Sequence, residues 1–156
     1  MEKTALFPGS FDPLTTGHVA VVERGLAIFD HVVVGVGFNP DKRSLLSPRK
    51  RVALAEQVFA GNNRVSVALY EGLTGSFCRS RGIRHILRGV RNSADFEFEQ
   101  TLDVANSQLY PEITTTVVFT PAELIAVSSK LVREILSMGG DASPFLPANI
   151  DITKYL

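Results

Sequence analysis

The stretch FPGSFDPLTTGH, residues 7–18, joins an apolar strand to a helix through a loop whose composition is typical of phosphate binding. Gly9 allows the backbone to approach a ligand closely or to adopt a left-handed conformation that a Cβ would resist. Ser10 adds a hydroxyl at the carboxyl end of the strand. Gly17 and His18 begin an amphipathic helical run, so the first backbone N–H groups and the helix dipole point at any anion held by the loop. His18 adds a side-chain donor at the same place.

Length and charge narrow the class of protein. The 156 residues are enough for one ordinary domain. Lys plus Arg and Asp plus Glu both number 16, so the net charge is zero and no global field attracts nucleic acid or an acidic membrane. Neither a secretory leader nor an apolar run long enough for a membrane span is apparent, so we expect a cytoplasmic protein. The one cysteine, Cys78, cannot form an internal disulfide, and we expect it to be a small buried apolar residue.

Strands rich in β-branched residues alternate with helices along the chain, which predicts an α/β fold with a parallel sheet covered on both faces. The predicted strands are Thr4–Phe7, His31–Gly37, Arg64–Tyr70, His85–Leu87 and Thr114–Thr120. Helices are expected after residues 17, 48, 74, 95 and 129, with a short one around Pro147–Tyr155. Helix boundaries are indicated by Ser47 and Pro48 at one start, and by Gly61, Gly82 and the pair Gly139-Gly140 at three ends.

Polar residues follow the strands. In an open parallel sheet, ligands bind at the carboxyl ends of the strands, near the point where the strand order reverses. We therefore expect these residues, which are scattered in sequence, to converge in space. They are Ser10 and His18 after the first strand, Asn39, Lys42 and Arg43 after the second, Arg88, Gly89 and Arg91 after the fourth, and Ser128 and Ser129 after the fifth.

A histidine in the first turn of a helix is by itself more often a surface or capping residue than a catalyst. The order of strand, glycine turn, hydroxyl, Thr15-x-Gly17-His18 and helix, however, resembles the signature of the nucleotidyltransferase superfamily with a T/H-x-G-H motif. The lead-in PGSFDP, residues 8–13, resembles the bacterial phosphopantetheine adenylyltransferase family. The resemblance implies a Rossmann-like, doubly wound, five-stranded sheet in one nucleotidyltransferase domain over residues 1–156, with His18 as the catalytic residue and Phe11 among the ATP contacts.

The segment HILRGVRNSADFEFE, residues 85–99, places Arg88 and Arg91 where a strand meets a loop. Their position fits solvent-facing charges equally well, but planar guanidinium groups match phosphate oxygens bidentately. We expect Phe96 and Phe98 to pack in the core rather than to stack on a base. The segment resembles the family's second motif, in which Gly89, Val90, Arg91 and Glu99 contact ATP and Arg88 contacts phosphopantetheine.

Ser128 and Ser129 precede a helical run and indicate a hydroxyl-capped helix. Most serines before a helix are simple caps. The resemblance implies more, because in the family this helix end binds the outer phosphates of ATP. Lys130 stands where a third Ser or Thr is common, and it fits either a phosphate-binding cation or a solvent-facing side chain. The implied nucleotide-contacting residues are Leu124, Ile125, Ala126, Val127, Ser128, Ser129 and Lys130.

Lys42 lies just past the second strand and matches the family's substrate-binding lysine. The resemblance adds Ser10, Thr74 and Arg88 as substrate-binding positions. The basic run at residues 49–51 begins the next helix, where positive charge opposes the helix dipole. It fits either an electropositive approach for anionic substrates or a solvated basic face.

The resemblance implies an enzyme that transfers the adenylyl group of ATP to 4′-phosphopantetheine, giving dephospho-coenzyme A and pyrophosphate. Mg²⁺ is expected to be held mainly by ATP phosphates and water, because no carboxylate cluster offers a protein site. The family also implies a homohexamer and raises feedback by coenzyme A; nucleic acid and membranes are not expected partners. Two alternatives stay open: another nucleotidyltransferase, which makes NAD or a CDP-alcohol, and a nucleotide-sensing module without turnover.

Overall fold

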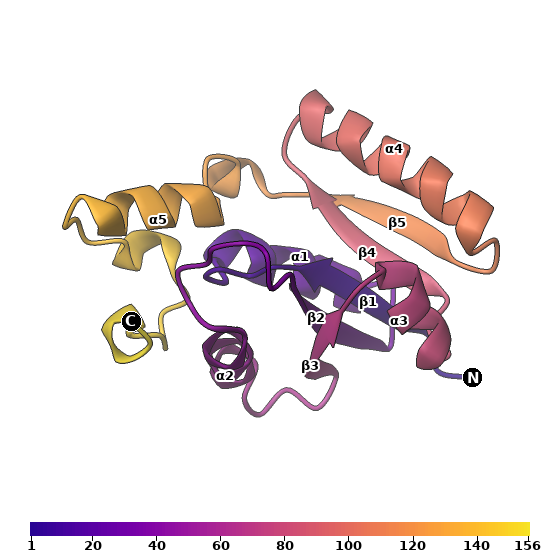
Figure 1. The fold of residues 1–156 in the computed structure, drawn as a ribbon, viewed down its shortest axis with the longest axis horizontal. Coiled ribbons are helices and arrows are strands. Elements are labelled where there is room, and N and C mark those ends of the chain that lie inside the picture. The colour runs from indigo at the N-terminus through magenta and orange to yellow at the C-terminus, as the bar shows by residue number, and fades with distance from the viewer.

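Five parallel strands form one sheet in the order β3-β2-β1-β4-β5, so the chain winds outward from β1 in both directions (Figure 1). The computed structural model describes residues 1–156. The predicted α/β fold with a doubly wound five-stranded sheet is confirmed. The strands are β1 (Thr4–Gly9), β2 (His31–Phe38), β3 (Val65–Glu71), β4 (His85–Val90) and β5 (Thr114–Phe119).

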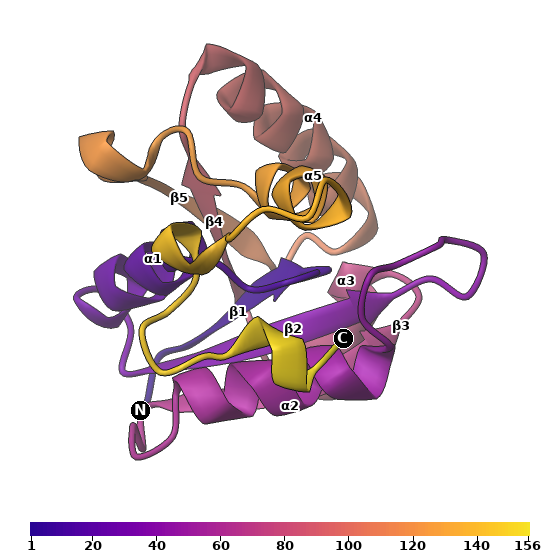
Figure 2. The same ribbon diagram turned by 90° about the vertical axis from the view of Figure 1, so that its left-hand side faces the viewer.

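Helices cover both faces of the sheet (Figures 1 and 2). Side chains alternate between the faces along each strand, so Phe7 packs with α1, α2 and α5, whereas Leu6 packs with α3 and the residues that follow α4. Burial on both faces explains the nearly continuous apolar composition of β1 and β2. The helices are α1 (Thr16–Leu26), α2 (Pro48–Val58), α3 (Thr74–Ser80), α4 (Ser93–Leu109) and α5 (Ser129–Ser137).

The expected helix boundaries are present. The Ser47 hydroxyl accepts a hydrogen bond from the backbone N–H of Lys50, and Pro48 is the first residue of α2. Gly82 and Gly139 follow α3 and α5 with φ of 67° and 76°, a left-handed conformation that glycine adopts without strain. These local signals therefore end the helices where the sequence predicts.

The C-terminal tail differs from the prediction of a short helix around Pro147–Tyr155. Only one 3₁₀ turn, Ile152–Lys154, forms there, and a second turn spans Ser143–Phe145. The tail runs beside α2 (Figures 1 and 2), with Ile152 in the core that also contains Leu54. Contacts with α2, rather than intrahelical hydrogen bonds, therefore fix the tail. Asn149 exchanges two hydrogen bonds of 3.0 Å with Gln57.

Cys78 is fully buried, as expected, and burial raises the pKa of its thiol to about 11. Such a thiol is unreactive at neutral pH. No helix of the protein combines the length and the apolar character that crossing a bilayer requires.

Candidate active site

Two cavities open at the carboxyl ends of the strands and share Ser10. The first, of about 370 Å³, lies over the start of α1. The second, of about 410 Å³, lies beside the segment that follows β2. The convergence predicted from the strand order is therefore observed, and it takes the form of two neighbouring cavities rather than one.

The first cavity brings together most of the residues that the sequence predicts to contact nucleotide. A Cβ on Gly89 would lie 2.4 Å from Cγ2 of Val21, so only glycine allows α1 to lie this close to β4. The predicted residues that line the cavity are Ser10, Phe11, His18, Arg88, Gly89, Arg91, Glu99, Val127, Ser128 and Ser129.

Some predicted residues do not line either cavity. Val90 is buried within β4, and Lys130, in the first turn of α5, is exposed to solvent and lines neither cavity. Thr74 begins α3 and reaches the second cavity only through Tyr70, whose hydroxyl lies 2.8 Å from Oγ1 of Thr74. The remaining residues outside both cavities are Leu124, Ile125 and Ala126.

The orientation of His18 follows from the start of α1. Nδ1 of His18 accepts a hydrogen bond of 2.9 Å from the backbone N–H of Thr15, which is the residue that caps the helix. Because a backbone N–H can only donate, the neutral ring carries its proton on Nε2. Nε2 has no protein partner, and no buried side-chain polar atom in the protein lacks one, so Nε2 faces the cavity. His18 therefore offers one N–H donor to the first cavity.

The charge state of His18 is set by its surroundings. Burial, and then the positive charges of Arg88 and Arg91, lower its pKa from 6.5 to about 4. The edge of the ring also meets Phe11, with the ring centroids 5.0 Å apart. At neutral pH the imidazole is uncharged and acts as a hydrogen-bond donor.

The two arginines that follow the predicted motif are held by carboxylates on α4. Arg88 donates from Nε and Nη2 to Oε1 of Glu99, at 2.8 and 2.6 Å, and its Nη1 donates to the carbonyl of Pro8. Arg91 donates from Nε to Asp95 at 3.0 Å. Both guanidinium groups are thereby fixed at the edge of the first cavity, where they present positive charge to an anion.

The start of α5 closes the cavity on another side. The Ser128 hydroxyl accepts from the backbone N–H of Leu131 at 3.1 Å, as a helix cap does. Ser129 Oγ donates to the carbonyl of Pro13 at 2.8 Å. Ser129 thus donates its only hydroxyl proton within the protein, whereas the Ser128 hydroxyl only accepts, so the Ser128 O–H and the first backbone N–H groups of α5 remain as donors for a phosphate.

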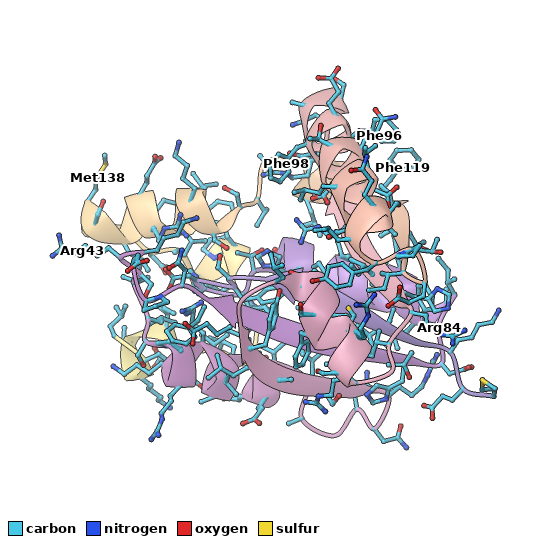
Figure 3. All side chains as sticks on the ribbon, turned by 45° about the vertical axis from the view of Figure 1, so that its right-hand side comes forward. Arg43, Arg84, Phe96, Phe98, Phe119 and Met138 are labelled. Carbon is cyan, nitrogen blue, oxygen red and sulfur yellow. The ribbon has the colours of Figure 1, made fainter.

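The second cavity contains Lys42, as predicted, and three cations more. Lys42 and Arg43 are exposed, and Figure 3 shows Arg43 extending from the body of the protein. Arg51 and Arg133 line the inner part of the cavity. No group of three or more His, Cys, Asp or Glu side chains is placed to hold a metal ion.

The prediction that Phe96 and Phe98 pack in the core is wrong, and one of the two alternatives left open for the basic run is excluded. Phe96 and Phe98 are 49% and 60% exposed rather than packed in the core, and Figure 3 shows both around the upper part of α4. The helix rises from the edge of the sheet, so only Glu99 is buried along it. The basic run at residues 49–51 is not one solvated face, because Arg51 is 4% exposed.

Sequence reasoning missed several residues that line the cavities. Asp95 lies four residues after Arg91, and this spacing could have revealed the pair. Thr120 follows β5 directly and fits the rule used for the other strands. Arg51, Tyr70 and Arg133 gave no comparable signal, because their partners are distant in sequence.

Comparisons with known proteins identify the class and the family of this chain. The profile of the cytidylyltransferase-like family matches residues 6–135, so the fold and the site define a nucleotidyltransferase. The chain belongs, within that class, to the phosphopantetheine adenylyltransferase family.

Relatives that match nearly the full length of the chain support this assignment. The chain is 43% identical over 150 residues to phosphopantetheine adenylyltransferase of Phocaeicola vulgatus, covering 96% of this chain and 99% of the relative. It is 45% identical over 144 residues to the Leuconostoc citreum enzyme of the same name, covering 92% and 90%. A bifunctional NMN adenylyltransferase/ADP ribose pyrophosphatase from Francisella tularensis has the same fold, with a TM-score of 0.72 and 16% identity over 97% of this chain and 47% of that longer one.

The environment of His18 gives a testable pH dependence. We expect the ring to remain neutral, with the proton on Nε2, at pH 7 and to protonate only near pH 4, because burial and two arginines disfavour the cation. Long-range ¹⁵N–¹H NMR correlations, recorded as a titration, measure both the tautomer and the pKa. A ring that protonates near pH 6.5 would contradict this picture.

The same shift affects stability. The unfolded chain protonates His18 near pH 6.5 and the folded protein near pH 4, so the contribution of the neutral ring is complete above pH 6.5 and is lost as the pH falls toward 4. The loss reaches at most about 3 kcal/mol. Urea unfolding at pH 7 and pH 4.5 should therefore show a larger loss for the wild type than for His18→Gln.

Proposed function

We propose that this protein transfers the adenylyl group of ATP to 4′-phosphopantetheine, giving dephospho-coenzyme A and pyrophosphate in the penultimate step of coenzyme A synthesis. The observation that carries the proposal is that Ser10 borders two cavities of similar size, each lined by cations. Two anionic substrates, one in each cavity, would meet at Ser10 above the start of α1. The relatives named for this reaction give the same assignment.

Catalysis needs no protein nucleophile, because the acceptor phosphate is itself one. The protein aligns the acceptor oxygen with the α-phosphorus for in-line attack and stabilises charge on the phosphoryl oxygens. Nε2–H of His18 is the donor for an α-phosphate oxygen, and its neutrality keeps the proton in place throughout the step. Pyrophosphate leaves toward the start of α5.

The two substrates have separate sets of contacts in this proposal. The ATP phosphates lie between Arg91 and the first N–H groups of α5, and the acceptor phosphate lies where the two cavities meet, between Lys42 of the second cavity and Arg88 of the first. Ser10 contacts both substrates. The further nucleotide contacts carried over from the resemblance are Phe11, Gly89, Val90, Glu99, Leu124, Ile125, Ala126, Val127, Ser128, Ser129 and Lys130, and Thr74 is carried over for the acceptor.

Mg²⁺ enters with ATP in this proposal. The two carboxylates that line the first cavity, Asp95 and Glu99, are both hydrogen-bonded to arginines. Phosphate oxygens and water therefore remain as the ligands that suit this ion. When bound, the ion neutralises phosphate charge. Localisation in the cytoplasm and feedback by coenzyme A stay predictions of the family resemblance.

The choice of acceptor is tested by pyrophosphate release. With ATP and Mg²⁺, the purified protein should turn over 4′-phosphopantetheine but neither nicotinamide mononucleotide nor choline phosphate, because the segment from Arg88 to Glu99 resembles that of the phosphopantetheine adenylyltransferase family. Chelation of Mg²⁺ should abolish the reaction. Comparable turnover of either alternative acceptor would refute the assignment, and ATP binding without any turnover would identify a nucleotide sensor.

The role of His18 is tested by separating kcat from KM. An interaction that strengthens in the transition state appears in kcat, whereas uniform binding appears in KM. Loss of one such donor in His18→Ala should lower kcat by on the order of 10²–10³, about 3–4 kcal/mol, with a far smaller change in KM for ATP.

The matched control for this variant is His31→Ala. His31 lies at the amino end of β2, at the opposite edge of the sheet from both cavities. Its removal should leave kcat unchanged. A folded His18→Ala enzyme with normal kcat and a raised KM for ATP would make His18 a ground-state binding residue only.

We further propose that the chain forms a homohexamer. The family resemblance supplies the number of subunits, and an exposed apolar face supports self-association. Its exposed apolar residues come from α4 and the edge strand β5 and include Phe96 at 49%, Leu109 at 58% and Phe119 at 75% exposure, whereas Phe98 lines the first cavity. Figure 3 shows Phe96 and Phe119 on one side of α4 and Phe98 on the other. Aromatic side chains gathered on one exposed face are typical of protein interfaces.

Light scattering coupled to size exclusion tests the assembly. The wild type should elute as a hexamer at micromolar concentration, and Phe119→Glu should dissociate it, because a carboxylate would be buried without a partner. Met138→Glu, at the exposed end of α5 and outside this face, should leave the mass unchanged. A monomeric wild type would exclude the hexamer.

A further inference from the structure

Arg51 is a buried cation that the proposed chemistry does not use. It lies in the first half of α2 and is 4% exposed, whereas its neighbours Arg49 and Lys50 are exposed and have no side-chain partner. The guanidinium donates to three backbone carbonyls and forms no ion pair within hydrogen-bonding distance. These are Leu46 O at 3.3 Å, Ser10 O at 2.7 Å and Gly37 O at 3.2 Å.

Burial of this charge is costly, and an apolar side chain would fill the same space without that cost. Burial lowers the pKa of Arg51, and the nearby Asp12 carboxylate opposes the shift. Arginine donates here from two nitrogens, Nε to Leu46 and Nη1 to Ser10 and Gly37, whereas the three N–H donors of a lysine share one nitrogen. The geometry of the three acceptors therefore explains why arginine occupies this position.

The three carbonyls belong to the parts of the chain that form the second cavity. Gly37 and Leu46 lie on either side of the segment 38–45, which carries Lys42. Ser10 is the residue that both cavities share. One guanidinium therefore joins the two ends of the Lys42 segment to Ser10.

A second set of hydrogen bonds holds the same junction. The Asp12 carboxylate accepts from the backbone N–H groups of Leu45 and Leu46, each at 2.8 Å. Lys42 itself has no side-chain partner, although its backbone N–H bonds to Asn39 O at 3.0 Å. The position of the Lys42 ammonium thus depends on how the ends of its segment are held.

We infer that Arg51 is a positioning residue for the acceptor phosphate, which sets the Lys42 segment at a fixed distance from Ser10. The inference rests on the proposed function. Arg51 acts by placing Lys42 relative to Ser10 and not through its charge, so its neighbours on the exposed side of α2 cannot replace it.

Steady-state kinetics of Arg51→Lys test this role, since lysine keeps the charge but carries all its donors on one nitrogen and so loses the two-nitrogen arrangement that joins Leu46 to Ser10 and Gly37. The KM for 4′-phosphopantetheine should rise by about tenfold or more and kcat should fall, because hydrogen bonds from a charged donor are lost. The KM for ATP should change by less than about twofold. The matched controls Arg49→Ala and Lys50→Ala remove a full charge from the same helix turn and should change neither KM. If Arg49→Ala or Lys50→Ala reproduced the Arg51→Lys effect, the positive potential of residues 49–51 would determine acceptor binding. That result would overturn the inference.

A double-mutant cycle separates positioning from a general loss of structure. In a Lys42→Ala background, Arg51→Lys should raise the acceptor KM by less than about twofold, because the residue through which it acts is already absent. Full additivity of the two changes would refute the inference, as would equal increases in both KM values.

Two further outcomes are informative. If Arg51→Lys does not fold, Arg51→Gln, which keeps a neutral amide donor, carries the same comparison, and failure of both to fold would assign Arg51 to stability alone and overturn the inference. If the wild type does not turn over 4′-phosphopantetheine, the proposed function fails, whatever the variants do. If the wild type is active but the variants change the KM for 4′-phosphopantetheine and the KM for ATP to the same extent, the proposed function stands and only the role of Arg51 is refuted.

Discussion

Hydrogen bonds from distant side chains to the backbone of residues 8–13 fix the geometry of the whole site. This segment comprises the last two residues of β1 and the loop that follows, where the pairing with neighbouring strands ends, so its carbonyl groups need other partners. Side chains from β4, α2 and α5 supply them, and the segment is thereby held from three sides. The pairs are Arg88 with Pro8, Arg51 with Ser10, Arg133 with Asp12, and Ser129 with Pro13.

Charge in this protein is organised locally. The net charge of the chain is zero, yet each cavity is lined by more cations than free carboxylates. In the first cavity, Asp95 and Glu99 orient Arg91 and Arg88 and so reduce the freedom of these cations without competing for a ligand. The carboxylates thus hold the two guanidinium groups in fixed positions, but they also neutralise part of the positive charge in the cavity.

The sequence predicts the layers of the fold and much of the first cavity, because the signals are local. Strand composition, helix caps and the rule that ligands gather at carboxyl ends place Ser10, His18 and Arg91 together. The failures are equally physical. Phe96 and Phe98 are apolar residues that the chain leaves exposed, so an argument from a single core misplaces them. Arg51 resembles its basic neighbours in sequence, and its distinction comes from carbonyls of Ser10 and Gly37 that only the fold brings near.

Ser10 lines both cavities, so a single molecule that occupies both cavities at once can bind with a higher affinity than either of its halves. When one half of such a molecule is bound, the other half is confined to a small volume near its own cavity, so its effective concentration there is high. A compound that links an adenylyl group to a pantetheine-like arm gains from this confinement without any new contact. The product of the proposed reaction has this form, and its departure therefore requires two groups of contacts to open together.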